Sequence, residues 1–274
     1  SIYNMVYRLD AMEAYNKRLV KKIAVKGITE SGSTATEGFV YLESINLSKA
    51  DPTATIQFDC IGAKGLRKKT ATVGIGYNLY DNSGESGKLD EYKEGFVVKS
   101  IDGRDNSVEF LNGVKIFAGD VIGKVSEDQL RRIQIRETIL SHLERERQLF
   151  HKGIKVLSLF FIDEVAKYKQ YDEAGHPFNG IYADMFEEEY NDILSSMQRE
   201  IGDEDYIRYL DAISAHDTHA GYFSVDKKGK MTDSKLSDKK EGTSDDIDAY
   251  DLIMKNKELL LDRDPKKPPV RFIF

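Results

Sequence analysis

The stretch Gly153-Ile-Lys-Val-Leu-Ser-Leu-Phe-Phe-Ile-Asp163 is almost uninterruptedly apolar from Ile154 to Ile162. Helical patterns lie on both sides of it, and Gly153 is the kind of residue at which helices end. An apolar run of this length between two helices is typical of a strand buried on both faces of a parallel sheet. The sequence therefore predicts a strand over 154–162 inside an α/β layer.

The segments around this strand show a helical period. Ser126, with Gln129 three residues later, forms a capping-box pattern that opens a long helix running toward His151. The elements expected beyond the strand are a helix over 182–197, a helix over 205–213, a hairpin turning at 227–229 and a helix over 247–260. A second apolar run, Val270–Phe274, is expected to lie beside 154–162 in one parallel sheet.

Residues 28–124 have a different character. Runs rich in Val, Ile, Thr, Phe and Tyr alternate with Gly, Asn, Asp and Ser, which is typical of short antiparallel strands joined by turns. The predicted strands are 39–47, 54–61, 70–80, 95–101 and 107–111. The expected fold is therefore mixed α+β and α/β: a connecting helix within 1–27, an antiparallel β-barrel-like module or sandwich over 28–124, and an α/β layer over 125–274.

The composition excludes several classes of protein. The 274 residues are 40% hydrophobic and 32% charged, which describes a folded chain and not a disordered one. No apolar run reaches the roughly 18 residues that a membrane helix needs, and the N-terminus has no secretory signal pattern. The single cysteine, Cys60, allows neither an internal disulfide nor a cysteine-based zinc site. We therefore expect a cytoplasmic protein with no membrane partner.

The charge is unevenly distributed along the chain. Residues 1–75 hold eleven Lys and Arg against seven Asp and Glu, a net charge of +4, although the whole chain carries −7. The densest basic cluster comprises Lys64, Arg67, Lys68 and Lys69, at the junction of two predicted strands. A solvated loop is the plainer interpretation of this cluster. Contact with the phosphates of a nucleic acid is the functional interpretation.

Motifs for catalysis or metal binding do not emerge. The segment 62–70 is rich in Gly and Lys, but it lacks the spacing of a phosphate-binding loop. His216 and His219 lie three residues apart, yet no third ligand is evident from the sequence, so a metal site is not expected there. We accordingly expect no catalytic residue and no metal ligand in this chain.

Three groups of segments carry a resemblance that spans nearly the whole chain and is weakest over 28–124. They are Tyr3-Asn-Met-Val-Tyr-Arg-Leu-Asp-Ala11 continuing to Ile23; Gln134-Ile-Arg-Glu-Thr-Ile139 with His142-Leu-Glu144 and Gly153–Asp163; and Thr218-His-Ala-Gly-Tyr-Phe-Ser-Val-Asp226 with Asp248–Lys257 and Val270-Arg-Phe-Ile-Phe274. Together they resemble the Res (restriction and translocation) subunit of type III restriction-modification enzymes.

The resemblance implies a superfamily 2 helicase-like motor that uses ATP and Mg²⁺, acts on double-stranded DNA and works with a methyltransferase (Mod) subunit. Residues 28–124 are then a β insertion, and residues 125–274 are part of a second RecA-like lobe, truncated at its C-terminal strand. The apolar strand matches the fourth motif of the family. Ser158, Phe160 and Asp163 are therefore implied to lie near the DNA backbone.

The same resemblance implies that a P-loop and an Asp-Glu box precede Ser1, and that an arginine motif and a nuclease domain follow Phe274. Phosphoryl transfer depends on the P-loop lysine, Mg²⁺ and an arginine. We therefore expect this chain alone to be inactive as an ATPase and as an endonuclease, and to need no cofactor. The alternative function is a non-catalytic β module that docks DNA or a protein.

Overall fold

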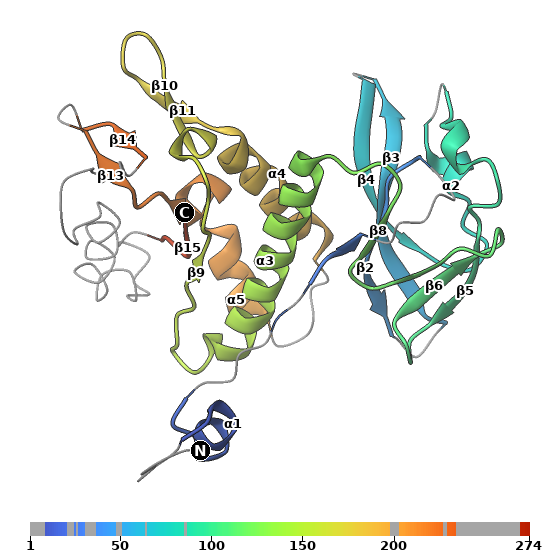
Figure 1. The fold of residues 1–274 in the computed structure, drawn as a ribbon, viewed down its shortest axis with the longest axis horizontal. Coiled ribbons are helices and arrows are strands. Elements are labelled where there is room, and N and C mark those ends of the chain that lie inside the picture. Colours follow the sequence, from blue (N-terminus) through green and yellow to red (C-terminus); the bar gives the residue numbers. More distant parts are fainter. Residues whose placement is uncertain are drawn as a thin grey trace, which may run out of the picture. The chain divides into compact units, whose positions relative to one another are not determined.

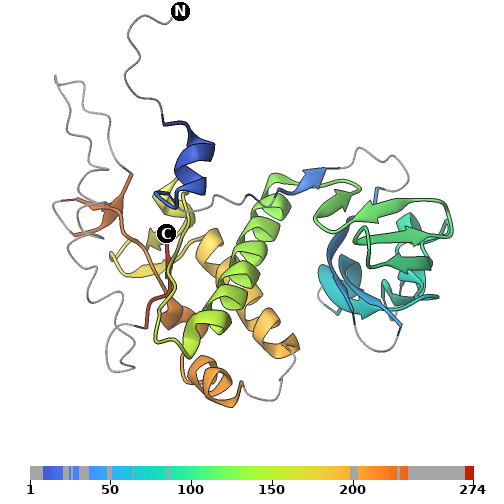
Figure 2. The same cartoon turned by 90° about the horizontal axis from the view of Figure 1, so that it is seen from below.

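A computed structural model describes residues 9–20, 25, 27–30, 37–47, 51–63, 65–84, 87–197, 203–226, 229–233 and 269–274. The chain divides into two compact units, Ser1–Val125 and Ser126–Phe274, and Figures 1 and 2 show their elements from two directions. Within the described residues, no helix is long and apolar enough to cross a membrane. The helix predicted over 247–260 lies outside the described residues.

The described residues of the first unit form two sheets. The larger sheet has the strand order β1-β8-β2-β3-β4, and the smaller one has the order β5-β6-β7. The bounds are β1 Thr29–Glu30, β2 Val40–Asn46, β3 Thr53–Gly62, β4 Gly65–Val73, β5 Val98–Asp102, β6 Ser107–Phe110, β7 Lys115–Phe117 and β8 Asp120–Ile122. Neighbouring strands are antiparallel except β1 and β8, which are parallel.

The two sheets enclose one apolar core. Alternate residues of β3 (Ala54, Ile56 and Phe58) are fully buried, as expected for a strand with one face on the core, and Val98 and Phe110 of the smaller sheet belong to the same cluster. Among the described residues, β1 and β4 each pair on one side only, so the larger sheet is open. The barrel-like prediction is therefore wrong, whereas the mixed α+β class with antiparallel sheets is confirmed.

The N-terminal helix is shorter than the segment 1–27 suggested. The helix α1 spans Ala11–Asn16 and begins at Asp10, whose side chain accepts a hydrogen bond from the backbone N–H of Glu13. It ends in a turn at which Arg18 has a φ of +59°. A left-handed residue of this kind terminates a helix, and residues 21–24 lie outside the described part.

The boundaries after residue 62 also differ from the prediction. The strand β4 covers Gly65–Val73, so basic residues that were expected at a strand junction lie inside a strand. The strand predicted over 70–80 ends at Val73, and a short helix, α2 (Leu79–Asn82), follows it with Asn78 as its N-cap. The sequence did not predict a strand at 65–69, because its charged residues suggested a loop. An antiparallel strand with one solvated face tolerates such charges.

Among its described residues, the second unit has three α-helices. The helix α3 (Glu127–Phe150) begins with the predicted capping box, in which Ser126 and Gln129 each accept a hydrogen bond from the other's backbone N–H. The predicted helices over 182–197 and 205–213 are confirmed as α4 (Ile181–Ser196) and α5 (Glu204–Asp211). The helices α3 and α4 pack along each other, as both views show.

A small parallel sheet shares its core with these helices. Its order is β12-β15-β9, with β12 at His219–Ala220, β15 at Phe272–Ile273 and β9 at Ser158–Leu159. The predicted neighbourhood of the two apolar segments is therefore confirmed. The strand β9 is shorter than the predicted strand 154–162. The segment is also not buried on both faces, because Leu159 is 47% exposed and Phe161 is 94% exposed.

Short elements complete the second unit. The hairpin predicted around 227–229 is confirmed by the antiparallel pairing of β13 with β14, although residues 227–228 lie outside the described part. A second hairpin, β10 with β11, was not predicted. The bounds are β10 Lys169–Tyr171, β11 Pro177–Asn179, β13 Ser224–Val225, β14 Met231–Thr232, and the 3-10 helices η1 Asp90–Tyr92 (first unit), η2 Val165–Lys167 and η3 Ala215–Thr218.

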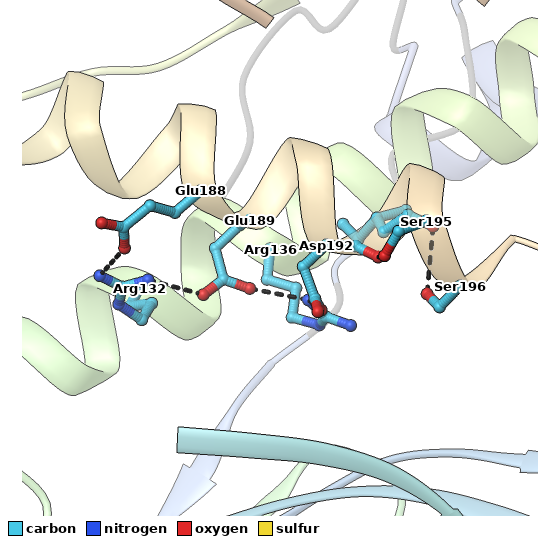
Figure 3. A network of polar contacts seen from close by, with 8 residues as sticks. Arg132, Arg136, Glu188, Glu189, Asp192, Ser195 and Ser196 are labelled. Carbon is cyan, nitrogen blue, oxygen red and sulfur yellow. Dashed lines mark hydrogen bonds and ion pairs between the residues drawn. The ribbon is translucent and has the colours of Figure 1, made fainter. Parts of the chain in front are cut away.

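Charged side chains are buried between α3 and α4 (Figure 3). The side chain of Arg136 is 2% exposed, and its Nη1 lies 2.7 Å from Glu189 Oε2 and 2.6 Å from Asp192 Oδ2. One turn earlier, Arg132 contacts Glu188 at 2.7 Å and Glu189 at 2.9 Å. These pairs fix the position of α4 along α3, because a slip of either helix would leave charges buried without partners.

A second buried ion pair joins the helices to the residue before β15. Arg271 is fully buried, and its Nη1 lies 2.6 Å from Glu146 Oε2 of α3. Its other terminal nitrogen donates to the hydroxyl of Tyr190 on α4. Glu146 also accepts a hydrogen bond of 3.0 Å from Tyr206 of α5. One buried cation therefore connects α3 and α4 directly, and α5 through Glu146.

Candidate nucleic-acid interface

The hairpin of β3 and β4 positions the basic residues of the first unit. The strands pair from Ala54 with Val73 to Gly62 with Gly65, so the chain reverses direction at residues 62–65. At the turn, Gly65 has a φ of +115°, which only glycine adopts easily. Lys64 lies outside the described residues.

The strand geometry separates the other three basic residues into two faces. Successive residues of a strand point to opposite faces, so Arg67 and Lys69 share one face and Lys68 lies on the other. The register agrees, because Lys68 pairs with Asp59, whereas Arg67 and Lys69 pair with Cys60 and Phe58. The basic cluster is therefore not one continuous patch.

Lys68 is engaged within the unit. Its Nζ lies 2.6 Å from Asp59 Oδ1 and 3.4 Å from the ring centroid of Phe39. The carboxylate compensates its charge and the aromatic ring covers it. Lys68 is consequently a poorer candidate for a phosphate contact than its two neighbours.

Arg67 and Lys69 line a groove of about 920 Å³ at the end of the hairpin. Arg67 is exposed and lies over Gly62, where an added Cβ would come within 2.8 Å of the arginine Nε. Lys69 donates a hydrogen bond of 3.3 Å to the backbone oxygen of Asn82. Among the described residues, no acidic side chain pairs with Arg67 or Lys69. Both cations are therefore available to an anionic ligand.

One acidic residue also lines this groove. Asp81 sits at its α2 side, but its carboxylate contacts Lys88 Nζ at 2.5 Å and accepts from the Asn78 amide at 2.7 Å. Its negative charge is thus matched by a lysine. Among the described residues that line the groove, Arg67 and Lys69 therefore leave an excess of positive charge.

In the second unit, Ser158 and Phe160 point toward the helices. The Ser158 hydroxyl lies 2.8 Å from His142 Nδ1 on α3. The Phe160 ring stacks on Phe274 at 4.4 Å between centroids and meets Phe186 of α4 edge-on at 6.2 Å. These two side chains hold β9 against the helices, so neither presents its polar or aromatic group on the outer face.

The exposed groups at this strand are different ones. Phe161, between Phe160 and Ile162, is 94% exposed. Asp163 is exposed and forms an ion pair with Lys167 at 2.5 Å, and this hydrogen bond lowers the pKa of its carboxyl. A pocket of about 170 Å³ lies beside them, lined in part by Arg131 and Gln134 of α3. The sequence did not indicate Phe161, because its exposure depends on how the segment after β9 is oriented.

These features define a two-unit α+β protein with a cationic groove in its antiparallel unit and a parallel sheet packed on helices in the other. The chain is 30% identical over 281 residues to the Res subunit of the type III restriction-modification enzyme EcoP15I of Escherichia coli, an alignment that covers 99% of this chain and 24% of that subunit. It is 33% identical over 178 residues to the Res subunit of the EcoPI enzyme of Escherichia phage P1, covering 62% of this chain and 16% of that subunit.

The chain is therefore homologous to part of the Res subunits of type III restriction-modification enzymes, and the resemblance found in the sequence is confirmed. It spans about a quarter, 24%, of the length of the EcoP15I subunit. No family model matches the chain, and no solved structure matches it.

Proposed function

We propose that this chain contributes DNA-backbone contacts and part of the second motor lobe to a type III Res subunit that translocates on double-stranded DNA in the cytoplasm. The observation that carries the proposal is the alignment with the EcoP15I Res subunit, which covers 99% of the chain. The intact subunit would use ATP and Mg²⁺ and assemble with a Mod methyltransferase. Residues 28–124 would be a β insertion, and residues 125–274 part of a RecA-like lobe.

The groove of the first unit supports the DNA-contact part of this proposal. Arg67 and Lys69 are unmatched by acidic groups among the described residues, and phosphates are the most abundant anions on a duplex surface. An arginine can donate two hydrogen bonds to one phosphate. Lys64, which lies outside the described residues, would add a third cation by its place in the sequence, whereas Lys68 would contribute least because of Asp59.

In the second unit, the contact would be made at the end of β9. Asp163 and Phe161 are exposed there, while Ser158 and Phe160 would position the strand from beneath. The chain alone is not expected to hydrolyse ATP, because its sequence holds no P-loop lysine. A phosphate-release assay with and without DNA checks this expectation, and DNA-stimulated turnover would contradict it.

The test of the groove is duplex-DNA binding by fluorescence anisotropy over a range of salt concentrations. The variant Arg67→Gln/Lys69→Gln removes two positive charges from the groove. If both side chains contact phosphates, the affinity for DNA falls. The negative slope of log K against log salt concentration then becomes less steep by about 2. A matched control, Lys99→Gln/Lys115→Gln, removes two charges from the smaller sheet and should leave affinity and slope nearly unchanged.

Two results would count against the DNA-contact role. Equal losses in the groove variant and the control would mean that only net charge matters. An absence of binding by the unaltered chain would favour the second candidate, in which the open sheet and its groove dock a protein such as the methyltransferase partner. A pull-down with that partner, repeated with the groove variant, then distinguishes the two roles.

A further inference from the structure

Three potential metal ligands from distant parts of the sequence meet in the second unit. Glu187 lies in α4, His216 in the 3-10 helix η3, and His219 is the first residue of β12. Glu187 Oε1 lies 3.0 Å from His216 Nδ1 and 3.3 Å from His219 Nε2, and one ligand atom from each of the three residues lies within 4.8 Å of the others. The pair of histidines therefore has the third donor that the sequence alone did not reveal.

The local backbone holds the two histidines in place. The Ser214 hydroxyl accepts a hydrogen bond from Asp217 N–H and caps η3, and the Thr218 hydroxyl donates to the Ala215 carbonyl at 2.7 Å. Directly after η3, β12 pairs with β15 in the parallel sheet. The His216 side chain is 62% exposed, while that of His219 is 2% exposed. The cluster is thus anchored in the core at one side and open to solvent at the other.

Neighbouring groups orient these donors as supporting residues do in metal sites. The Tyr168 hydroxyl lies 2.9 Å from His219 Nδ1, so it can accept the Nδ1 proton and leave Nε2 free for a metal. The Asn179 side chain donates to Glu187 Oε1 at 2.8 Å and fixes the carboxylate. Tyr168 therefore orients His219, and Asn179 orients Glu187 through the same Oε1 that faces the two histidines.

We propose that Glu187, His216 and His219 bind one Zn²⁺ ion, which ties α4 to β12. Two imidazole nitrogens and one carboxylate oxygen form a ligand set that zinc accepts. Metal–ligand bonds of about 2.0–2.1 Å in a tetrahedron place ligand atoms roughly 3.3 Å apart, and two of the separations here are 3.0 and 3.3 Å. One ring nitrogen of each histidine lies within 4.8 Å of the other, and the His216 side chain is exposed. A water would complete the coordination.

The experiment uses the 274-residue chain after treatment with a chelator. Titration calorimetry with Zn²⁺ should show one site, and Co²⁺ in its place should give the intense visible absorption of tetrahedral coordination. His216→Ala removes an exposed ligand without opening the core, and it should weaken Zn²⁺ binding by at least about 100-fold. Tyr168→Phe removes only the supporting hydroxyl and should weaken binding by about 10- to 100-fold.

The matched control is His176→Ala, because the His176 side chain is 79% exposed and pairs with Asp172 outside the cluster. It should bind Zn²⁺ like the unaltered chain. The proposal is overturned if the unaltered chain binds no Zn²⁺, if His216→Ala binds it equally well, or if His176→Ala loses as much affinity as His216→Ala. Circular dichroism of each variant verifies that the fold is retained. Since Arg67 and Lys69 belong to the first unit, DNA binding and metal binding are measured independently.

Discussion

The two units of this chain stabilise their interiors in different ways. The first unit encloses an apolar core, and its exposed surface carries ion pairs such as Lys99 with Glu109. The second unit buries Arg271 with Glu146 and Arg136 with Glu189 inside its helical layer. In the first unit, Arg67 and Lys69 therefore have no acidic partner among the described residues, whereas the buried charges of the second unit specify how its own helices and strands pack.

The largest effect is expected from Arg271→Met. The change leaves the Glu146 carboxylate, whose side chain is 3% exposed, buried without its cation. Breaking a buried pair in this way costs about 3–5 kcal/mol of unfolding free energy. Hydrogen exchange measured by mass spectrometry should show loss of protection in α3 and α4, with β2 and β3 of the first unit unchanged.

The control for this prediction removes both charges. Glu146→Gln/Arg271→Met should be less destabilised than the sum of the two single variants, because no isolated charge remains. An equal loss of protection in both units would contradict the proposed separation. So would a fully additive double variant.

A smaller loss is expected in the first unit from Tyr92→Phe. The fully buried Tyr92 hydroxyl donates to the Phe39 carbonyl at 2.6 Å and accepts from Asp59 N–H at 2.9 Å. Its removal leaves buried polar groups unpaired, which costs about 1–3 kcal/mol. Urea denaturation followed by circular dichroism measures the loss. Tyr80→Phe is the matched control, since no hydrogen bond joins the Tyr80 hydroxyl to another described residue, and it should unfold like the unaltered chain.

Acid should weaken the second unit selectively through His142. Burial lowers the pKa of His142, with Glu146 opposing and Arg271 assisting the shift. The unfolded chain therefore takes up this proton at a higher pH, near 6.5. Stability is complete above that value and falls as the pH drops, by at most about 1.4 kcal/mol per pH unit.

All five histidines of the chain lie after residue 125, so the first unit has no such response. Hydrogen exchange at about pH 7 and about pH 5.5, corrected for the intrinsic rates, compares the two units directly. His142→Gln should reduce the response of the second unit, and His219, whose pKa burial also lowers, accounts for the remainder. If both units lose protection alike on acidification, carboxylates rather than His142 control the acid sensitivity.

Elements with strong local signals were predictable from the sequence. The capping box at Ser126 and the helical periods gave α3, α4 and α5, and the two apolar runs gave the neighbours β9 and β15. The predicted length of β9 was wrong. Apolar residues can be exposed as well as buried, and Phe161 is exposed. The position predicted for β4 in the sequence was wrong. This strand is stabilised by its pairing with β3, and its own charged residues do not indicate a strand.

The candidate sites depended still more on tertiary structure. The sequence singled out the basic cluster, but only the register of β4 separates Lys68 from Arg67 and Lys69. It also showed the pair His216 and His219, whereas Glu187 lies on another element, 29 residues before His216 and 32 before His219. Spacing within one segment can suggest two ligands of a site, and a third from a distant helix carries no sequence signal.

The smallest effect is expected from the exposed ion pairs of the first unit. Lys115 contacts Asp105 at 2.7 Å, and this hydrogen bond raises the pKa of the lysine and lowers that of the carboxyl. Both side chains are exposed, so water and salt screen the attraction. Lys115→Met should therefore leave the urea midpoint unchanged within error, at low and at high salt. A loss of unfolding free energy comparable to that of Tyr92→Phe would mean that surface charges stabilise the first unit. Arg67 and Lys69 could then serve stability instead of ligand binding.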